Sequence, residues 1–138
     1  PWINLFLPSH TALDFIQEAL ARTSLAEVGQ GVISIYPYNH SAFVAPFFRV
    51  PATSHFFLFA LLRNAIPPTT AHAEQLVAAN RQLFERAKAA GGTRYPVDSV
   101  PMIQRDWVEH FGQMWEIFVM FKQFFDPDNL FAPGQRIF

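Results

Sequence analysis

Trp2 and Asn4 are the first residues whose types and spacing could serve a ligand. They lie at i and i+2 in an apolar segment rich in strand-forming residues, so a strand would place both side chains on one face. An indole ring can stack on a flat heterocycle, and an amide can hydrogen-bond to its edge. The alternative is that Trp2 belongs to the core and that Asn4 satisfies only neighbouring backbone groups.

Tyr95 and Gln135 are two further candidates, each close to flexible residues. Tyr95 follows Gly91-Gly92 at a short distance and directly precedes Pro96, while Gln135 directly follows Gly134. Glycine lets backbone approach a ligand closely, and an amide can both donate and accept hydrogen bonds. The alternatives are edge packing for Tyr95 and an ordinary C-terminal turn for Gln135.

The other polar residues form no catalytic or metal-binding motif. None of the five His residues has the His-x3-His spacing of a helical metal pair, so we expect no metal site. There is no Gly-x-Ser-x-Gly elbow, and Gly91-Gly92 would end a helix rather than open one around a phosphate. The absence of Cys excludes thiolate chemistry. We therefore expect no catalytic residue and no self-sufficient enzyme in this sequence.

Apolar residues dominate the 138-residue sequence: 51% are hydrophobic, 16 are Phe, and only 15% are charged. A net charge of −1 argues against nucleic-acid binding, which needs a basic face. No apolar run reaches the roughly 18 residues of a membrane span, and residues 1–8 show no signal-peptide pattern. The chain therefore has more apolar surface than a single domain of this length should need.

Hydrophobic periodicity predicts an α+β fold that positions these residues. Pro37 is expected to close the second strand, because proline lacks a backbone N–H. The predicted strands cover 2–7, 32–36 and 55–62, the predicted helices cover about 9–23, 69–90 and 106–125, and an extended tail covers 130–138.

Five strings together resemble cytokinin dehydrogenases. Each is weak alone, but they follow one another in the family's order from one end of the chain to the other. They are PWINLFLP (1–8), IYPYN (35–39), FLFALLR (57–63), DWVEHFG (106–112) with Trp115 and Phe118, and FDPDNLFAPGQRIF (125–138).

The resemblance implies an FAD-dependent oxidoreductase of the vanillyl-alcohol-oxidase type, of which this chain would be the C-terminal part. Residues 1–95 would form part of a substrate-binding cap domain, built on an antiparallel sheet flanked by helices. Residues 96–138 would return to the FAD-binding domain and complete it. A missing N-terminal part would carry the pyrophosphate loop, any histidyl link to the flavin, and the Asp that takes the substrate proton.

The resemblance also assigns roles to single residues. The residue at 132 is Ala where many members have Ser, so only its backbone could contact FAD. By this resemblance, the substrate would be bound by Trp2, Asn4 and Pro96. FAD would be bound by Tyr95, Ala132 and Gln135.

The implied activity is oxidation of a secondary amine, the N6 side chain of an adenine-type cytokinin or a similar planar substrate, by hydride transfer to the flavin. The chain departs from the family pattern at His40 to Phe43 and at Pro96, so another planar amine or an alcohol is the alternative substrate. The expected partners are FAD, this substrate and the missing N-terminal domain. A chain severed from that domain would expose apolar surface and associate with itself or with the missing part. The alternative is a stand-alone α+β ligand-binding or dimerisation module without redox activity.

Overall fold

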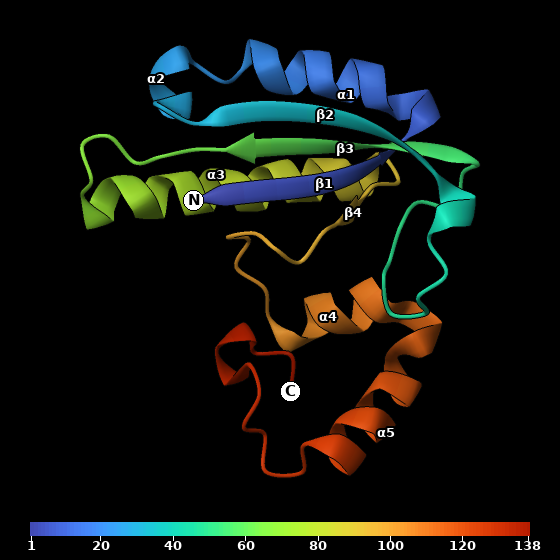
Figure 1. Ribbon diagram of the computed structural model, residues 1–138. Coiled ribbons are helices and arrows are strands. Elements are labelled where there is room, and N and C mark those ends of the chain that lie inside the picture. Colours follow the sequence, from blue (N-terminus) through green and yellow to red (C-terminus); the bar gives the residue numbers. More distant parts are fainter. The chain divides into compact units, whose positions relative to one another are not determined.

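The computed structural model describes residues 1–138 and confirms the α+β class. Its core is a four-stranded antiparallel sheet with the order β2-β3-β1-β4 (Figure 1). The strands are β1 (Trp2–Pro8), β2 (Val32–Asn39), β3 (His55–Leu62) and β4 (Thr93–Arg94). The helices are α1 (Ser9–Ala21), α2 (Leu25–Val28), α3 (Thr70–Ala89), α4 (Gln104–Phe111) and α5 (Trp115–Phe125), with short 3-10 helices η1 (His40–Ala42), η2 (Gly112–Met114) and η3 (Pro133–Gln135).

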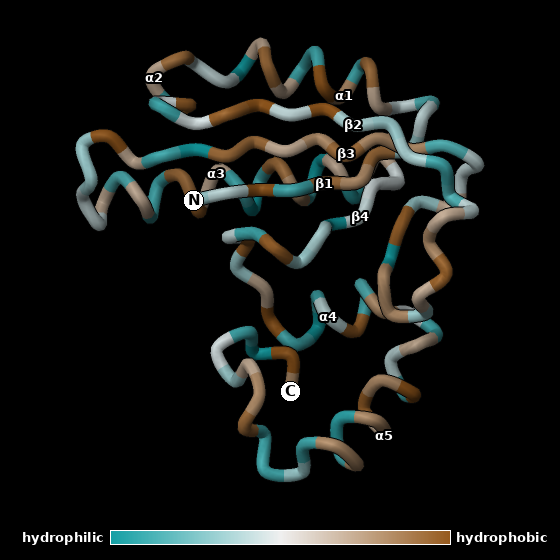
Figure 2. The backbone as a smooth tube through the Cα atoms, in the orientation of Figure 1, coloured by the Kyte–Doolittle hydropathy of each residue, from teal (hydrophilic) through white to brown (hydrophobic).

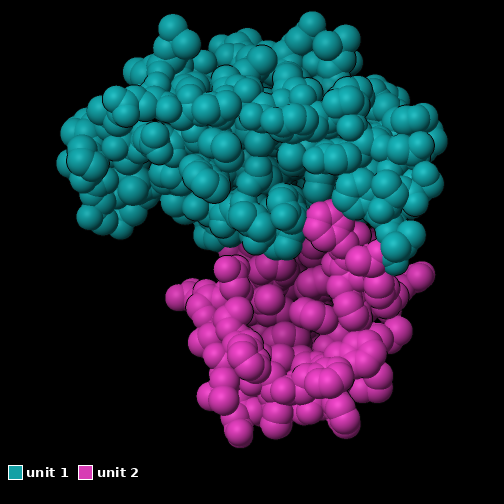
Figure 3. Space-filling view, in the orientation of Figure 1, with its two compact units in different colours: residues 1–44, 50–101 teal, residues 45–49, 102–138 magenta.

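The chain divides into two compact units (Figure 3). The first comprises residues 1–44 and 50–101, and contains the sheet with α1, α2 and α3. The second comprises residues 45–49 and 102–138, and contains α4, α5 and the tail. No helix in either unit has the length and apolar character that crossing a membrane requires.

One face of the sheet is covered by α1 and α3. Leu5 pairs with Phe59 across β1 and β3, and Phe15 of α1 packs edge-on against Phe59 at 6.3 Å between ring centroids. From α3, Leu76, Leu83 and other apolar side chains are buried along one stripe. Apolar residues dominate β3 in Figure 2, in keeping with its central place in the sheet. This layer is the hydrophobic core of the first unit.

The opposite face of the sheet carries the side chains that alternate, along each strand, with those buried in the core. Trp2, Asn4 and Phe6 of β1 lie on this face, and Asn4 stands level with Ala60 of β3. The N-terminal end of the face is open, since Trp2 is 48% exposed. At the other end an aromatic cluster closes it, formed by Phe6, Tyr38, Phe43 and Phe56.

Two predicted boundaries were wrong, and each has a local cause. β2 continues through Pro37 to Asn39, because β2 is an edge strand and a missing N–H can be tolerated on its unpaired side. The predicted helix 106–125 is two helices. Gly112 adopts φ 52°, a left-handed conformation that ends α4 before α5 begins.

The second unit is held together mainly by aromatic side chains. Trp107 is 2% exposed and stacks on Phe111 at 6.0 Å between centroids. Phe47, from the segment 45–49, packs against Phe118 at 5.2 Å and also contacts Phe111. Much of the outer surface of α5 stays apolar and exposed, with Phe124 76% exposed.

Candidate functional site

Three of the predicted site residues meet on the open face of the sheet. The Tyr95 N–H donates to the Asn4 carbonyl oxygen at 3.0 Å, which continues the pairing of β1 with β4 by one residue. The Tyr95 side chain therefore shares a face with Asn4 and Trp2, and its ring lies 5.7 Å from that of Phe6. The sequence placed Trp2 and Asn4 on one face correctly, and the fold adds Tyr95 beside them.

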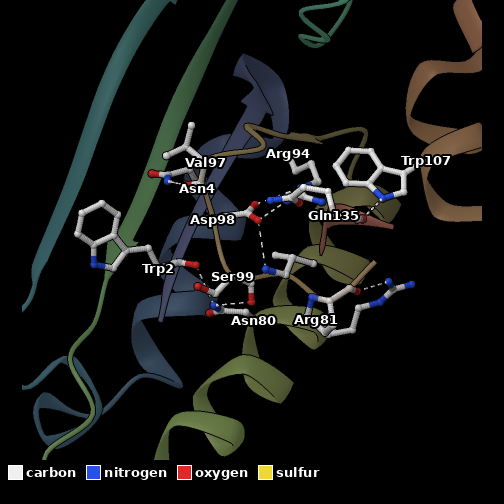
Figure 4. A network of polar contacts seen from close by, with 12 residues as sticks. Trp2, Asn4, Asn80, Arg81, Arg94, Val97, Asp98, Ser99, Trp107 and Gln135 are labelled. Atoms are coloured by element: carbon white, nitrogen blue, oxygen red, sulfur yellow. Dashed lines mark hydrogen bonds and ion pairs between the residues drawn. The ribbon is translucent and has the colours of Figure 1, made fainter. Parts of the chain in front are cut away.

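Asn4 is buried, yet only the nitrogen of its side-chain amide makes a hydrogen bond within the protein. Its Nδ2 donates to the Val97 carbonyl oxygen at 2.5 Å, which fixes the orientation of the amide. Its Oδ1 points away from Val97 and accepts no hydrogen bond within the protein (Figure 4). The exposed indole of Trp2 thus lies on the same face as a fixed, free hydrogen-bond acceptor.

Asn80 of α3 links the backbone of β1 to the loop that follows Tyr95 through hydrogen bonds (Figure 4). It is fully buried, and its Nδ2 donates to the carbonyl oxygens of Trp2 at 2.9 Å and Ser99 at 3.3 Å. The Ser99 N–H also donates to the Trp2 carbonyl oxygen at 2.8 Å. One helix side chain therefore holds the strand and the loop that carry the candidate ligand residues.

A buried ion pair holds the loop that follows Tyr95. The Arg94 guanidinium binds the Asp98 carboxylate through Nε, at 3.2 Å from Oδ2, and through Nη2. The Val100 N–H adds a hydrogen bond to Oδ1 at 3.1 Å. Burial raises the pKa of Asp98, since desolvation outweighs the opposing effects of Arg94 and Val100. The ion pair therefore fixes the loop, although burying its two charges carries an unfavourable desolvation free energy.

Three residues that support the site were not predicted from the sequence: Asn80, Arg94 and Asp98. Asn80 carries a readable signal, because it interrupts the apolar stripe of α3 four residues after Leu76 and three before Leu83. A polar residue on a buried stripe needs partners. Arg94 and Asp98 carry no such signal, because a two-residue strand and a loop have no usable periodicity.

Ala132 and Gln135 lie in the tail turn of the second unit. The Gln135 carbonyl oxygen accepts a hydrogen bond from Trp107 Nε1 at 3.0 Å, and the Gln135 N–H donates to the Ala132 carbonyl oxygen at 3.0 Å. The backbone of Gln135 is thus anchored to a buried indole, while its side-chain amide is exposed and makes no hydrogen bond. Pro96, assigned to the substrate, is exposed in the loop of the first unit.

Asp126 fixes the start of this tail. Its carboxylate accepts hydrogen bonds from the N–H groups of Leu130 at 2.8 Å and Phe131 at 3.0 Å, and it pairs with Lys122. Burial alone would raise the pKa of Asp126, but the hydrogen bonds from Lys122 and the two amides outweigh it and lower the pKa below its ordinary value.

We expect the stability that Asp126 contributes to be lost in acid. A carboxyl whose pKa is lowered by folding stabilises the fold at pH values above its unfolded pKa of about 3.9, and this contribution disappears as the pH falls through the folded pKa. Below about pH 4 the thermal midpoint of the wild type should therefore fall more steeply than that of Asp126→Asn. Asp128→Asn, at an exposed carboxylate without hydrogen bonds, is the control and should follow the wild type. Parallel curves for wild type and Asp126→Asn would contradict the assignment.

Comparison with known proteins decides the family. A protein-family model described as "Cytokinin dehydrogenase 1, FAD and cytokinin binding" matches residues 1–138. The chain belongs to this family. The resemblance carried by the five strings is therefore confirmed over the whole chain, and so is the fold class expected of a cytokinin-binding domain.

The curated relatives that the chain matches are named as oxidoreductases. The chain is 36% identical over 137 residues to "Uncharacterized oxidoreductase ORF5 in fasciation locus" of Rhodococcoides fascians, with 99% of this chain and 31% of that protein covered. It is 35% identical to cytokinin dehydrogenase 5 of Oryza sativa subsp. japonica and 33% identical to cytokinin dehydrogenase 1 of Arabidopsis thaliana. All of this chain is covered in both, but only 27% and 24% of those enzymes. The chain thus spans about a quarter to a third of the relatives' length.

Proposed function

We propose that this chain is the C-terminal portion of an FAD-dependent oxidoreductase that oxidises a secondary amine on a planar substrate, such as the N6 side chain of an adenine-type cytokinin. The observation that carries the proposal is the free Oδ1 acceptor of Asn4 on the same open sheet face as the exposed indole of Trp2. Membership of the FAD- and cytokinin-binding family supports it.

Each residue of the open face has a role that follows from its chemistry. The Trp2 indole offers a flat surface on which a heterocycle can stack. Asn4 Oδ1 accepts a hydrogen bond from an N–H on the edge of that heterocycle, and the bond from Nδ2 to Val97 keeps the acceptor in place. Tyr95 borders the same face, and Pro96 shapes the adjoining loop. The chain's part is to bind and orient the substrate and to exclude water from it.

The chemistry of the Gln135 side-chain amide fits a flavin cofactor. Gln135 presents a free amide on a backbone that Trp107 holds, and an amide can satisfy both donors and acceptors on a polar cofactor edge. We assign Gln135, the backbone of Ala132, and Tyr95 to FAD. When bound, the flavin ring supplies the acceptor for the hydride that leaves the carbon beside the substrate amine.

The proposal also accounts for the exposed apolar surface. On α5 and the tail, Phe124, Phe125 and Phe131 are each at least 70% exposed, which is unusual for large aromatic side chains. We propose that residues 1–95 belong to the substrate cap and that 96–138 complete the FAD-binding domain. The apolar residues of α5 would then pack against the N-terminal part of that domain. Without that part, the chain should associate through this surface and lack activity.

The cofactor assignment predicts that Gln135→Ala weakens FAD binding by about three- to tenfold, the effect of losing one or two neutral hydrogen bonds. The measurement is FAD release from the complete protein, followed by flavin fluorescence during dilution. Gln123→Ala is the matched control, since Gln123 is an exposed amide on α5 of the same unit. Equal FAD retention in both variants would remove Gln135 from the cofactor site.

A further inference from the structure

A second candidate binding site lies on the helix-covered side of the sheet, away from Trp2 and Asn4. It is a hollow of about 590 Å³ between α1 and α3. Leu61 lies beneath it, and Leu61 pairs with Ile3, so it belongs to the face opposite Asn4. The charged side chains around the hollow are those of Arg22, Glu27, Arg63, Arg81, Glu85 and Arg86.

Arg63 is the unusual member of this set. It follows β3 directly and is only 3% exposed. Its Nη2 donates to the carbonyl oxygen of Leu76 at 3.1 Å and to Asn80 Oδ1, and both acceptors are neutral. Its Nε is buried without any hydrogen-bond partner. The guanidinium is therefore held in one position by neutral acceptors, without a carboxylate in ion-pair contact.

The other arginines at the hollow are more accessible than Arg63, and each has a carboxylate partner. Arg22 and Arg86 both bind Glu18, at 3.0 Å and 2.9 Å, and Arg81 binds Glu85 at 2.5 Å. Arg63 takes part in no ion pair. A buried charge is normally paired, because its desolvation otherwise destabilises the fold.

Glu27 is the carboxylate whose charge acts on Arg63, but its hydrogen bonds go to Ser24 instead. Its Oε2 accepts hydrogen bonds from the Ser24 N–H at 2.7 Å and the Ser24 hydroxyl at 2.9 Å, which caps α2. The backbone hydrogen bond from Ser24 is the largest cause that lowers the pKa of Glu27, and Arg63 contributes less. Glu27 thus stays ionised as a helix cap and leaves Arg63 without a direct counter-ion.

We propose that this hollow binds a small oxyanion, a phosphate or carboxylate group, with Arg63 as its central ligand. Arginine suits such groups, because its planar guanidinium offers several N–H donors in a fixed arrangement. The carbonyl of Leu76 and the amide of Asn80 already hold that guanidinium, so little side-chain entropy is lost on binding. Arg22 and Arg86 at the rim add positive charge.

The test is isothermal titration of the complete protein with inorganic phosphate and, separately, with acetate, at constant ionic strength in chloride. We expect saturable binding in the millimolar range or tighter, and the better of the two probes identifies the preferred group. Absence of saturable binding for both probes overturns the proposal. This readout involves neither flavin nor turnover, so it is independent of the proposed oxidoreductase function.

Variants then locate the site. Arg63→Gln should weaken the anion affinity by at least about tenfold, the usual effect of losing a charge-assisted hydrogen bond, whereas Arg22→Gln at the rim should change it by less than about threefold. Arg63→Lys keeps the positive charge but lacks the planar guanidinium, so its anion affinity should lie between those of Arg63→Gln and Arg22→Gln. It also provides the test if Arg63→Gln does not fold. Unchanged affinity in both Arg63 variants would overturn the assignment to this residue.

Discussion

Asp98→Ala should lower the free energy of unfolding by about 3–5 kcal/mol, because it leaves the Arg94 guanidinium buried without its carboxylate. Both side chains are almost completely inaccessible, at 1% and 0% exposed. The variant also removes the acceptor for the Val100 N–H. Urea denaturation followed by far-ultraviolet circular dichroism measures the change.

A double variant separates the cost of an unpaired charge from a general packing defect. Arg94→Met with Asp98→Leu removes both charges and fills the space with apolar atoms, a replacement that is often neutral or stabilising for buried ion pairs. We expect it to recover most of the stability that Asp98→Ala loses. If the double variant is as unstable as the single one, the pair does not act through its charges.

Asn4→Ala should weaken binding of a planar amine by about 10- to 100-fold in the complete protein while leaving the flavin content unchanged. The reason is that the N–H of a desolvated ligand would lose its acceptor, which costs about 1–3 kcal/mol. Titration of N6-isopentenyladenine against the protein's tryptophan fluorescence measures the affinity, and absorbance after denaturation measures the flavin. Equal loss of both would mark Asn4 as structural.

Ser34→Ala is the matched control for Asn4. Ser34 pairs with Ala60, which pairs with Asn4, so Ser34 lies in the same row on the same face, two strands away. At the usual strand spacing this is about 10 Å from Asn4. The change should alter the affinity by less than about twofold. A loss as large as that of Asn4→Ala would place the ligand over β2 instead.

The sheet was predictable from sequence where its strands show a clear apolar pattern. β3 is a nearly unbroken apolar run and was placed correctly at 55–62. β4 was not predicted, because two residues, Thr93 and Arg94, form no pattern and pair with β1 only through tertiary structure. The break at Gly112 was also missed, since the aromatic residues on either side continue a helical spacing.

The candidate site was predictable only in part. The period of a strand places Trp2 and Asn4 together, whereas Tyr95 joins them through a pairing between segments some 90 residues apart. The supports of the site, Asn80 and the Arg94–Asp98 pair, depend on contacts that local patterns do not encode. The roles assigned to Trp2, Asn4, Pro96, Tyr95, Ala132 and Gln135 stay predictions.

Anaerobic mixing of the complete protein with N6-isopentenyladenine tests the central claim most directly. The claim is that this chain orients a planar amine for oxidation by a bound flavin. We expect the long-wavelength flavin absorbance to bleach on mixing, and the substrate concentration for half-maximal bleaching to rise about 10- to 100-fold in Asn4→Ala. A complete protein that carries no flavin, or whose flavin stays oxidised with this substrate and with related planar amines and alcohols, would contradict the account.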